Sequence, residues 1–183
     1  MEIDSIVGAI ADALKQIDSS GVPFKDFQPG VGRYGEPQLV KLVAGYLNDL
    51  PHYAHSVKTM RTPDLLVRNQ WALEIKIARP FGDNGKPAEN WSVNLLHPYC
   101  GNTSLLGNCL KLRSLSCEEQ KGVIVIGYEN DPPVVTLEPL LRSFEVIARQ
   151  VLGVEIGNRV EARRAGLIHP VHQQLVVAGW QID

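Results

Sequence analysis

The sequence predicts one α/β domain built on a mixed β-sheet flanked by helices, and three observations lead to this prediction. The local patterns follow each other in the order helix, three strands, helix, strand, helix. Residues 122–128 form a continuous apolar run, which is typical of a strand covered on both faces. The 183 residues contain no internal repeat or low-complexity linker, and they suffice for one substantial core. We therefore expect residues 1–183 to form a single domain.

Two helices are expected before the first strand. Residues 5–17 repeat apolar side chains at helical spacing, as at Ile6, Ile10 and Leu14. Residues 19–35 contain four glycines and two prolines and are expected to form a loop. A second helix is expected from Glu36 to about Leu50, because a proline at position 37 suits a first helical turn.

Three candidate strands follow, at residues 55–59, 64–68 and 71–77. The first is weak, whereas the other two alternate polar and apolar side chains. Only Asn69 and Gln70 separate Arg68 from Trp71, and a link this short predicts a β-hairpin.

The second half begins with an irregular stretch, residues 80–102, which is rich in Gly, Pro and Asn. Loops of this length are usually functional or mobile. Helices are then predicted at residues 102–116 and 137–152, and a final strand at residues 171–182. Residues 153–165 fit neither pattern clearly.

Composition limits the function classes. The formal net charge of −2 argues against a protein that coats nucleic acid non-specifically, but it leaves room for local basic surfaces. No apolar run approaches the length of a membrane helix, and the first residues lack the pattern of a secretion signal. We expect a cytoplasmic protein with no membrane partner.

The sequence contains two basic clusters. The simpler interpretation of such clusters is solvated surface charge. The first comprises Lys58, Arg61, Arg68, Lys76 and Arg79, and the second comprises Arg159, Arg163 and Arg164.

The three cysteines are an odd number, which favours reduced thiols. A structural zinc site usually requires two closely spaced pairs of ligands. Only one such pair, His97 and Cys100, is present, because Cys109 and Cys117 lie farther apart along the chain. Buried free thiols are the preferred interpretation.

The residues that suggest chemistry are Asp64, Glu74 and Lys76. Side chains alternate along a strand, so Glu74 and Lys76 share one face while Leu73 and Ile75 face a core. If the two strands pair, Asp64 lies beside Glu74. Two carboxylates this close repel each other, and a hard divalent cation such as Mg²⁺ would offset the repulsion. A surface hairpin with an ordinary salt bridge is the simpler alternative.

The segment Pro63-Asp64, nine residues, then Glu74-Ile75-Lys76 resembles the motif of the PD-(D/E)XK phosphodiesterase superfamily. The resemblance covers residues 36–128 and implies a restriction endonuclease-like fold. It also implies a nuclease that hydrolyses DNA by in-line attack of a water activated by Mg²⁺ or Mn²⁺. Asp64, Glu74 and the Ile75 carbonyl would hold the ion, and Lys76 would position the water. Because one such site cuts one strand at a time, a homodimer is expected.

Glu36 is the candidate for the additional acidic residue that the first helix of this superfamily often carries, and it would complete the metal shell or hold a second ion. It precedes the apolar positions Leu39, Val40 and Val43, so it projects toward the core side of its helix. The alternative is a first-turn Glu that interacts favourably with the helix dipole. Weaker candidates for contacts with substrate are Arg33, Arg79 and Lys111, the last at helical spacing with Ser104 and Asn108.

The rival functional hypothesis is a catalytically inactive module of the same fold that binds nucleic acid or protein. Large superfamilies often retain a fold after losing its chemistry. The ionisable positions of the motif are all filled here, which favours activity.

Overall fold

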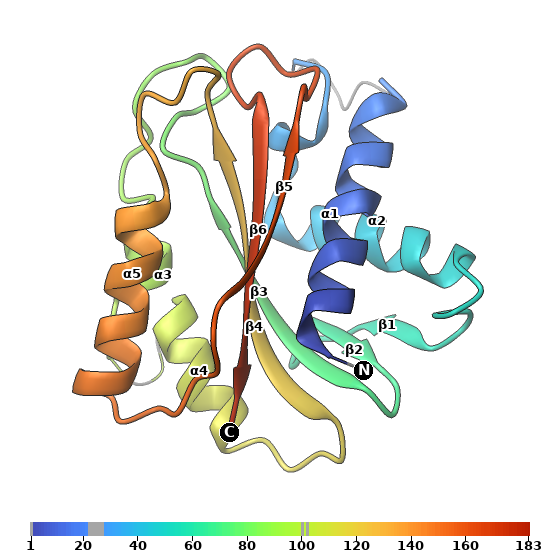
Figure 1. The fold of residues 1–183 in the computed structure, drawn as a ribbon, viewed down its shortest axis with the longest axis vertical. Helices are drawn as coiled ribbons and strands as arrows, with labels where there is room; N and C mark the ends of the chain where they lie inside the picture. Colours follow the sequence, from blue (N-terminus) through green and yellow to red (C-terminus); the bar gives the residue numbers. More distant parts are fainter. Residues whose placement is uncertain (1, 22–27, 100, 102) are drawn as a thin grey trace.

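The protein is a single α/β domain in which a six-stranded mixed sheet lies between two layers of helices (Figure 1). The computed structural model describes residues 2–21, 28–99, 101 and 103–183. The strand order is β1-β2-β3-β4-β6-β5. The helices are α1 (Ile3–Ser19), α2 (Glu36–Asp49), α3 (Val93–Leu96), α4 (Leu105–Arg113) and α5 (Glu138–Val146), with a 3-10 turn at Val31–Arg33 and a π-helical turn at Ile147–Val151. The strands are β1 (Val57–Thr59), β2 (Leu65–Val67), β3 (Trp71–Ala78), β4 (Gln120–Glu129), β5 (Val160–Ala165) and β6 (Gln174–Ile182).

The predicted hairpin is confirmed. Strands β2 and β3 pair antiparallel, with Leu65 opposite Leu73 and Val67 opposite Trp71. Strand β3 then pairs parallel with β4 across a crossover that contains α3 and α4. Strand β6 joins β4 antiparallel, and β5 forms the far edge. The sheet is therefore mixed, as the sequence predicts.

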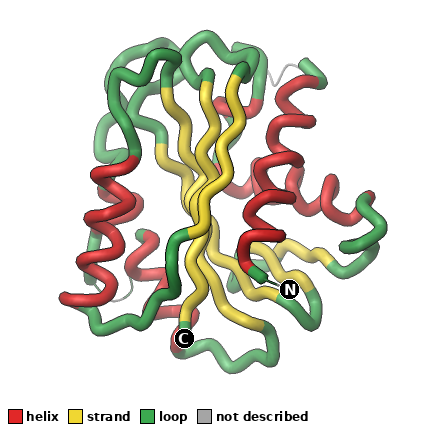
Figure 2. The backbone as a smooth tube through the Cα atoms, viewed as in Figure 1, coloured by secondary structure: helices red, strands yellow, loops and turns green. Residues whose placement is uncertain are grey.

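Each face of the sheet has its own hydrophobic core. Helices α1 and α2 cover one face and α3, α4 and α5 cover the other, with the sheet between them (Figures 1 and 2). The alternation along β3 is as predicted, because Leu73, Ile75 and Ile77 pack in the core beneath α1 and α2. Glu74 has the opposite orientation, and its carboxylate contacts Lys111 of α4.

Most expected elements are present with shifted ends. The helix expected at residues 102–116 begins at Leu105, because the Ser104 side chain accepts a hydrogen bond from the Gly107 amide and caps it. Residues 153–165, which fit no pattern, contain the edge strand β5. Its side chains alternate between half-buried and exposed and are mostly polar or small, so the apolar signal is weak.

The cysteines do not all follow the prediction of buried thiols. Cys109 is buried, and burial raises the pKa of its thiol to about 12, but Cys117 is exposed. The prediction is therefore wrong for Cys117, which lies in the turn after α4 where little covers it. Cys100 lies outside the described residues. No helix in the described part of the chain combines the length and the apolar character that crossing a membrane requires.

Candidate active site

The β2–β3 hairpin brings Asp64 and Glu74 together. Asp64 immediately precedes β2, and continuing the register one step beyond Leu65 and Leu73 places it opposite Glu74. Asp64 Oδ2 accepts a hydrogen bond of 2.9 Å from the Ile75 amide, which fixes the carboxylate against β3. This is the proximity that the sequence predicts for the two carboxylates.

Glu74 is a buried acid in an unfavourable environment. Its side chain is 1% exposed, and its Oε1 atom lies 2.8 Å from Lys111 Nζ. Burial raises the pKa of Glu74 to about 7; the hydrogen bond from Lys111 opposes this rise, and the negative charge of Asp64 adds to it. Lys111 thus compensates only part of the cost of burying the Glu74 charge beside Asp64.

Glu36 does not join the two carboxylates. At the start of α2, its Oε1 lies 2.6 Å from Lys76 Nζ, so the lysine of the motif binds Glu36. Within the described residues, the one cluster of three potential metal ligands with mutual distances below 4.8 Å comprises Asp83, His169 and His172. Glu36 therefore forms no cluster of this kind with Asp64 and Glu74 within the described residues, and it is paired with Lys76 instead.

Two cavities flank Glu36 and extend along the hairpin. One of about 550 Å³ is lined by Glu36, Lys41, Arg61, Asp64 and neighbouring residues. The other, of about 400 Å³, is lined by Glu36, Arg79, Asp83, Glu89 and Trp91, among others. Glu36 lines both cavities, and Asp64 lines the larger one.

The weaker candidates have varied environments. Arg33 is 5% exposed and its Nη1 donates to the Gln28 carbonyl, so burial removes it as a contact for phosphate. Arg79 lines the smaller cavity, and its Nη1 donates to the Gly32 carbonyl at 2.6 Å. Lys111 forms an ion pair with Glu74, whereas the sequence suggests that it contacts substrate. Asn108 is buried on the same helix, and Ser104 serves as the cap of that helix.

The second basic cluster is neutralised by carboxylates. Arg159 lies 2.8 Å from Glu138, Arg163 lies 2.6 Å from Glu161, and Arg164 lies 2.6 Å from Asp12. These pairs leave little excess positive charge around β5. A contact with phosphates is better sought on the hairpin side.

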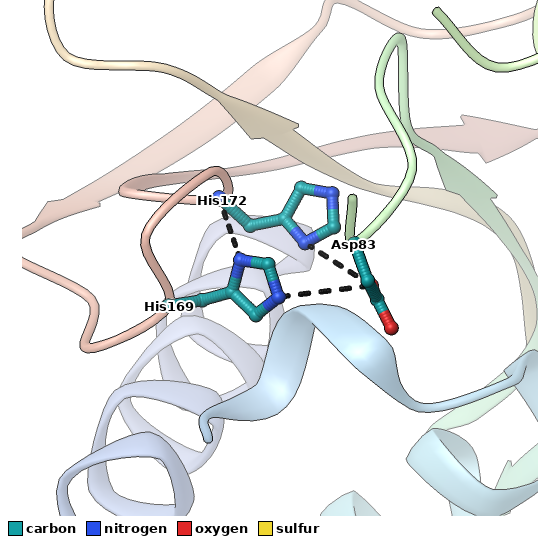
Figure 3. Close-up of side chains that lie close together, drawn as sticks. All are labelled: Asp83, His169 and His172. Carbon is teal, nitrogen blue, oxygen red and sulfur yellow. Dashed lines mark hydrogen bonds and ion pairs between the residues drawn. The ribbon is translucent and has the colours of Figure 1, made fainter. Parts of the chain in front are cut away.

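The cluster of Asp83, His169 and His172 was missed by the sequence reasoning (Figure 3). His169 and His172 come from the loop before β6, and Asp83 follows β3. Both imidazoles are buried, and desolvation lowers the pKa of His169 to about 4 and also lowers that of His172. The close spacing of the two histidines was the only available signal in the sequence. By contrast, His97, Cys109 and Cys117 form no such cluster in the part of the chain that the structure describes.

Comparisons of this chain with models of known protein families, with curated proteins and with solved structures found no match. The functional argument therefore depends on the geometry above.

Proposed function

We propose that this protein is a metal-dependent deoxyribonuclease with a restriction endonuclease-like fold. The observation that carries the proposal is the pair of carboxylates at the hairpin, where a buried Glu74 with a raised pKa faces Asp64. Mg²⁺ or Mn²⁺ between the two oxygens would offset both the burial of Glu74 and the mutual repulsion.

The residues present suit such an ion. Asp64 and Glu74 offer carboxylate oxygens, and the resemblance to the PD-(D/E)XK motif assigns the Ile75 carbonyl as a further ligand. A hard divalent ion lowers the pKa of a bound water and polarises a phosphoryl group. Lys76, two residues after Glu74 on the same face of β3, would orient the attacking water opposite the P–O bond that breaks. Glu36 holds the Lys76 ammonium at 2.6 Å and would fix its direction.

The order of elements supports the same proposal. Helix α2, strands β1, β2 and β3, the helical crossover of α3 and α4, and strand β4 follow the helix, three strands, helix, strand order of this superfamily. The cavity beside Asp64 is lined by Lys41 and Arg61, whose positive charges suit a phosphate backbone. DNA is accordingly the proposed substrate, and a homodimer would allow both strands to be cut.

The test is cleavage of supercoiled plasmid and of single-stranded DNA in Mg²⁺, in Mn²⁺ and in EDTA. We expect cutting with either ion, none in EDTA, and cutting at least about 100-fold slower by Lys76→Ala. Lys58→Ala, at an exposed position on β1, is the matched control and should cut normally. Cutting that persists in EDTA, or that Lys76→Ala does not slow, would overturn the mechanism.

A second candidate is an inactive module of the same fold that binds nucleic acid or protein. The observation that favours it is the pairing of both lysines, Lys76 with Glu36 and Lys111 with Glu74. These ion pairs compensate the carboxylates without a metal ion, as a purely structural network would. Calorimetric titration with Mn²⁺ separates the candidates, because the nuclease must bind the ion through Asp64 and Glu74 whereas the module need not.

A further inference from the structure

The aspartate–histidine cluster joins two loops at one end of the sheet. Asp83 follows β3, while His169 and His172 lie in the segment between β5 and β6. His169 Nε2 and His172 Nδ1 are 3.7 Å and 3.9 Å from Asp83 Oδ1, and the rings stack with centroids 4.4 Å apart (Figure 3). Both nitrogens are buried without a hydrogen-bond partner, and both point toward the carboxylate. Two such nitrogens are costly unless something binds them.

His172 is oriented as a metal ligand. Its Nε2 lies 2.9 Å from the Phe81 carbonyl, which can only accept, so the ring proton is on Nε2. The Nδ1 lone pair therefore points at the Asp83 side. A histidine that binds a metal through one ring nitrogen usually donates the N–H of the other to a carboxylate or a backbone carbonyl, and the Phe81 carbonyl is such an acceptor for His172.

His169 has the same tautomer, with its proton on Nε2, but it turns this nitrogen rather than Nδ1 toward Asp83. Its Nδ1 accepts hydrogen bonds of 3.1 Å from the amides of Val171 and His172. The proton of the neutral ring is consequently on Nε2, directed at Asp83. His169 can therefore donate to the carboxylate, but it offers no lone pair there.

Asp83 connects the cluster to the cavity of about 400 Å³. Its side chain is 26% exposed, and it lines that cavity with Glu36 and Glu89. Glu36 is paired with Lys76, so Asp83 and Glu89 are the carboxylates of this lining that would attract a cation. Arg79 also lines this cavity, and its Nη1 donates to the Gly32 carbonyl. An ion and its water ligands could reach Asp83 from this side.

We propose that Asp83 and His172 Nδ1 bind a borderline divalent transition ion of the Zn²⁺ class, and that His169 is a positioning residue that orients the Asp83 carboxylate. Imidazole nitrogen with one carboxylate suits Zn²⁺ better than Mg²⁺, which prefers oxygen ligands. Water or a ligand in the cavity would fill the remaining coordination positions. This site shares no ligand with the carboxylate pair of the proposed nuclease.

The test is titration of the intact protein with Zn²⁺ by calorimetry and with Co²⁺ by visible absorption, since Co²⁺ reports its ligands spectroscopically. We expect one Zn²⁺ ion to bind, and binding to be lost in Asp83→Asn and in His172→Ala. His169→Asn keeps an acceptor near the position of Nδ1 and removes the Nε2 donor. It should weaken Zn²⁺ binding by about 10- to 100-fold, the usual effect of losing a group that orients a ligand.

Two controls make the result specific. The double variant His52→Ala/His55→Ala removes exposed histidines and should bind Zn²⁺ as the parent does. Glu74→Gln should also bind Zn²⁺ normally, so failure of the nuclease proposal would not affect this result. Circular dichroism without metal identifies any variant that has not folded. If His172→Ala does not fold, Asp83→Asn still tests the site.

Absence of Zn²⁺ binding, or binding unchanged in Asp83→Asn, would overturn the proposal. Complete loss in a folded His169→Asn would overturn the positioning role.

Discussion

The two polar clusters of this protein differ in chemistry and in how the chain assembles them. The hairpin site, Asp64 and Glu74 with the nearby Glu36–Lys76 pair, consists of carboxylates and lysines fixed by adjacent strands and the start of α2. The aspartate–histidine cluster, Asp83, His169 and His172, contains nitrogen donors held by loops. Oxygen ligands favour hard ions and imidazoles favour borderline ones, so the two sites should discriminate between metals.

The largest expected effect is on cleavage. Lys76→Ala should reduce the rate of DNA cutting by at least about 100-fold, within the range for a group that positions or deprotonates the attacking water. It should leave Zn²⁺ binding at the aspartate–histidine cluster unchanged. The measurement is the initial rate of plasmid nicking in Mg²⁺ together with a Zn²⁺ titration. A parallel loss of both properties would show damage to the fold and would remove the contrast between the sites.

The hairpin site could be predicted from sequence because its geometry is local. Nine residues separate Asp64 from Glu74, and strand alternation with a short turn nearly determines their relative position. The partners of the charged groups were less predictable. The pairing of Lys76 with Glu36 and of Lys111 with Glu74 depends on how α2 and α4 pack on the sheet.

The aspartate–histidine cluster could not be predicted in the same way. His169 and His172 are separated from Asp83 by more than 80 residues, and their meeting depends on β6 lying beside β4. The strand order, with β6 inserted between β4 and β5, has no local signal in the sequence. Which ring nitrogen of each histidine faces Asp83 depends on hydrogen bonds with backbone amides and a carbonyl, which residue types do not show.

The next effect is on stability without metal. Because the folded pKa of Glu74 is raised to about 7, the folded state binds a proton that the unfolded chain releases near pH 4.5. The contribution of this group to the free energy of unfolding should therefore fall as pH rises from 4.5 to 7 and level off above that. The change is on the order of 3 kcal/mol. Glu74→Gln, which cannot ionise, should lack this decline.

Urea unfolding in EDTA between pH 5 and pH 8 measures this effect. The informative quantity is the difference between the parent and Glu74→Gln, because other titrating groups cancel. Glu118→Gln, an exposed position, should follow the parent at every pH. A difference that does not change with pH would show that Glu74 ionises normally, and the hairpin site would lose the repulsion that a cation is proposed to relieve.

A steric change should affect the aspartate–histidine cluster selectively. A Cβ atom on Gly32 would lie 2.3 Å from His172 Nδ1 and 2.6 Å from the His172 Cβ, so the buried ring would have to move. Overpacking of this kind typically costs about 1–3 kcal/mol. We expect Gly32→Ala to lower stability by that amount in urea and to weaken Zn²⁺ binding while Mn²⁺ binding at the hairpin site persists. Unchanged Zn²⁺ binding would show that Nδ1 of His172 is not a ligand.

The smallest expected effect compares two arginines. Arg61 is exposed and lines the cavity beside Asp64, whereas Arg164 is paired with Asp12 at 2.6 Å on β5. If DNA lies along the hairpin, Arg61→Ala should remove one phosphate contact and lower the slope of log affinity against log salt by about 1. Arg164→Ala should change neither the affinity nor the slope, because its charge is already neutralised. Fluorescence anisotropy with labelled DNA in Ca²⁺, across a range of salt, makes the comparison without cleavage. Equal slopes for Arg61→Ala and the parent would place the DNA elsewhere on the molecule, and a larger loss in Arg164→Ala would place it on β5.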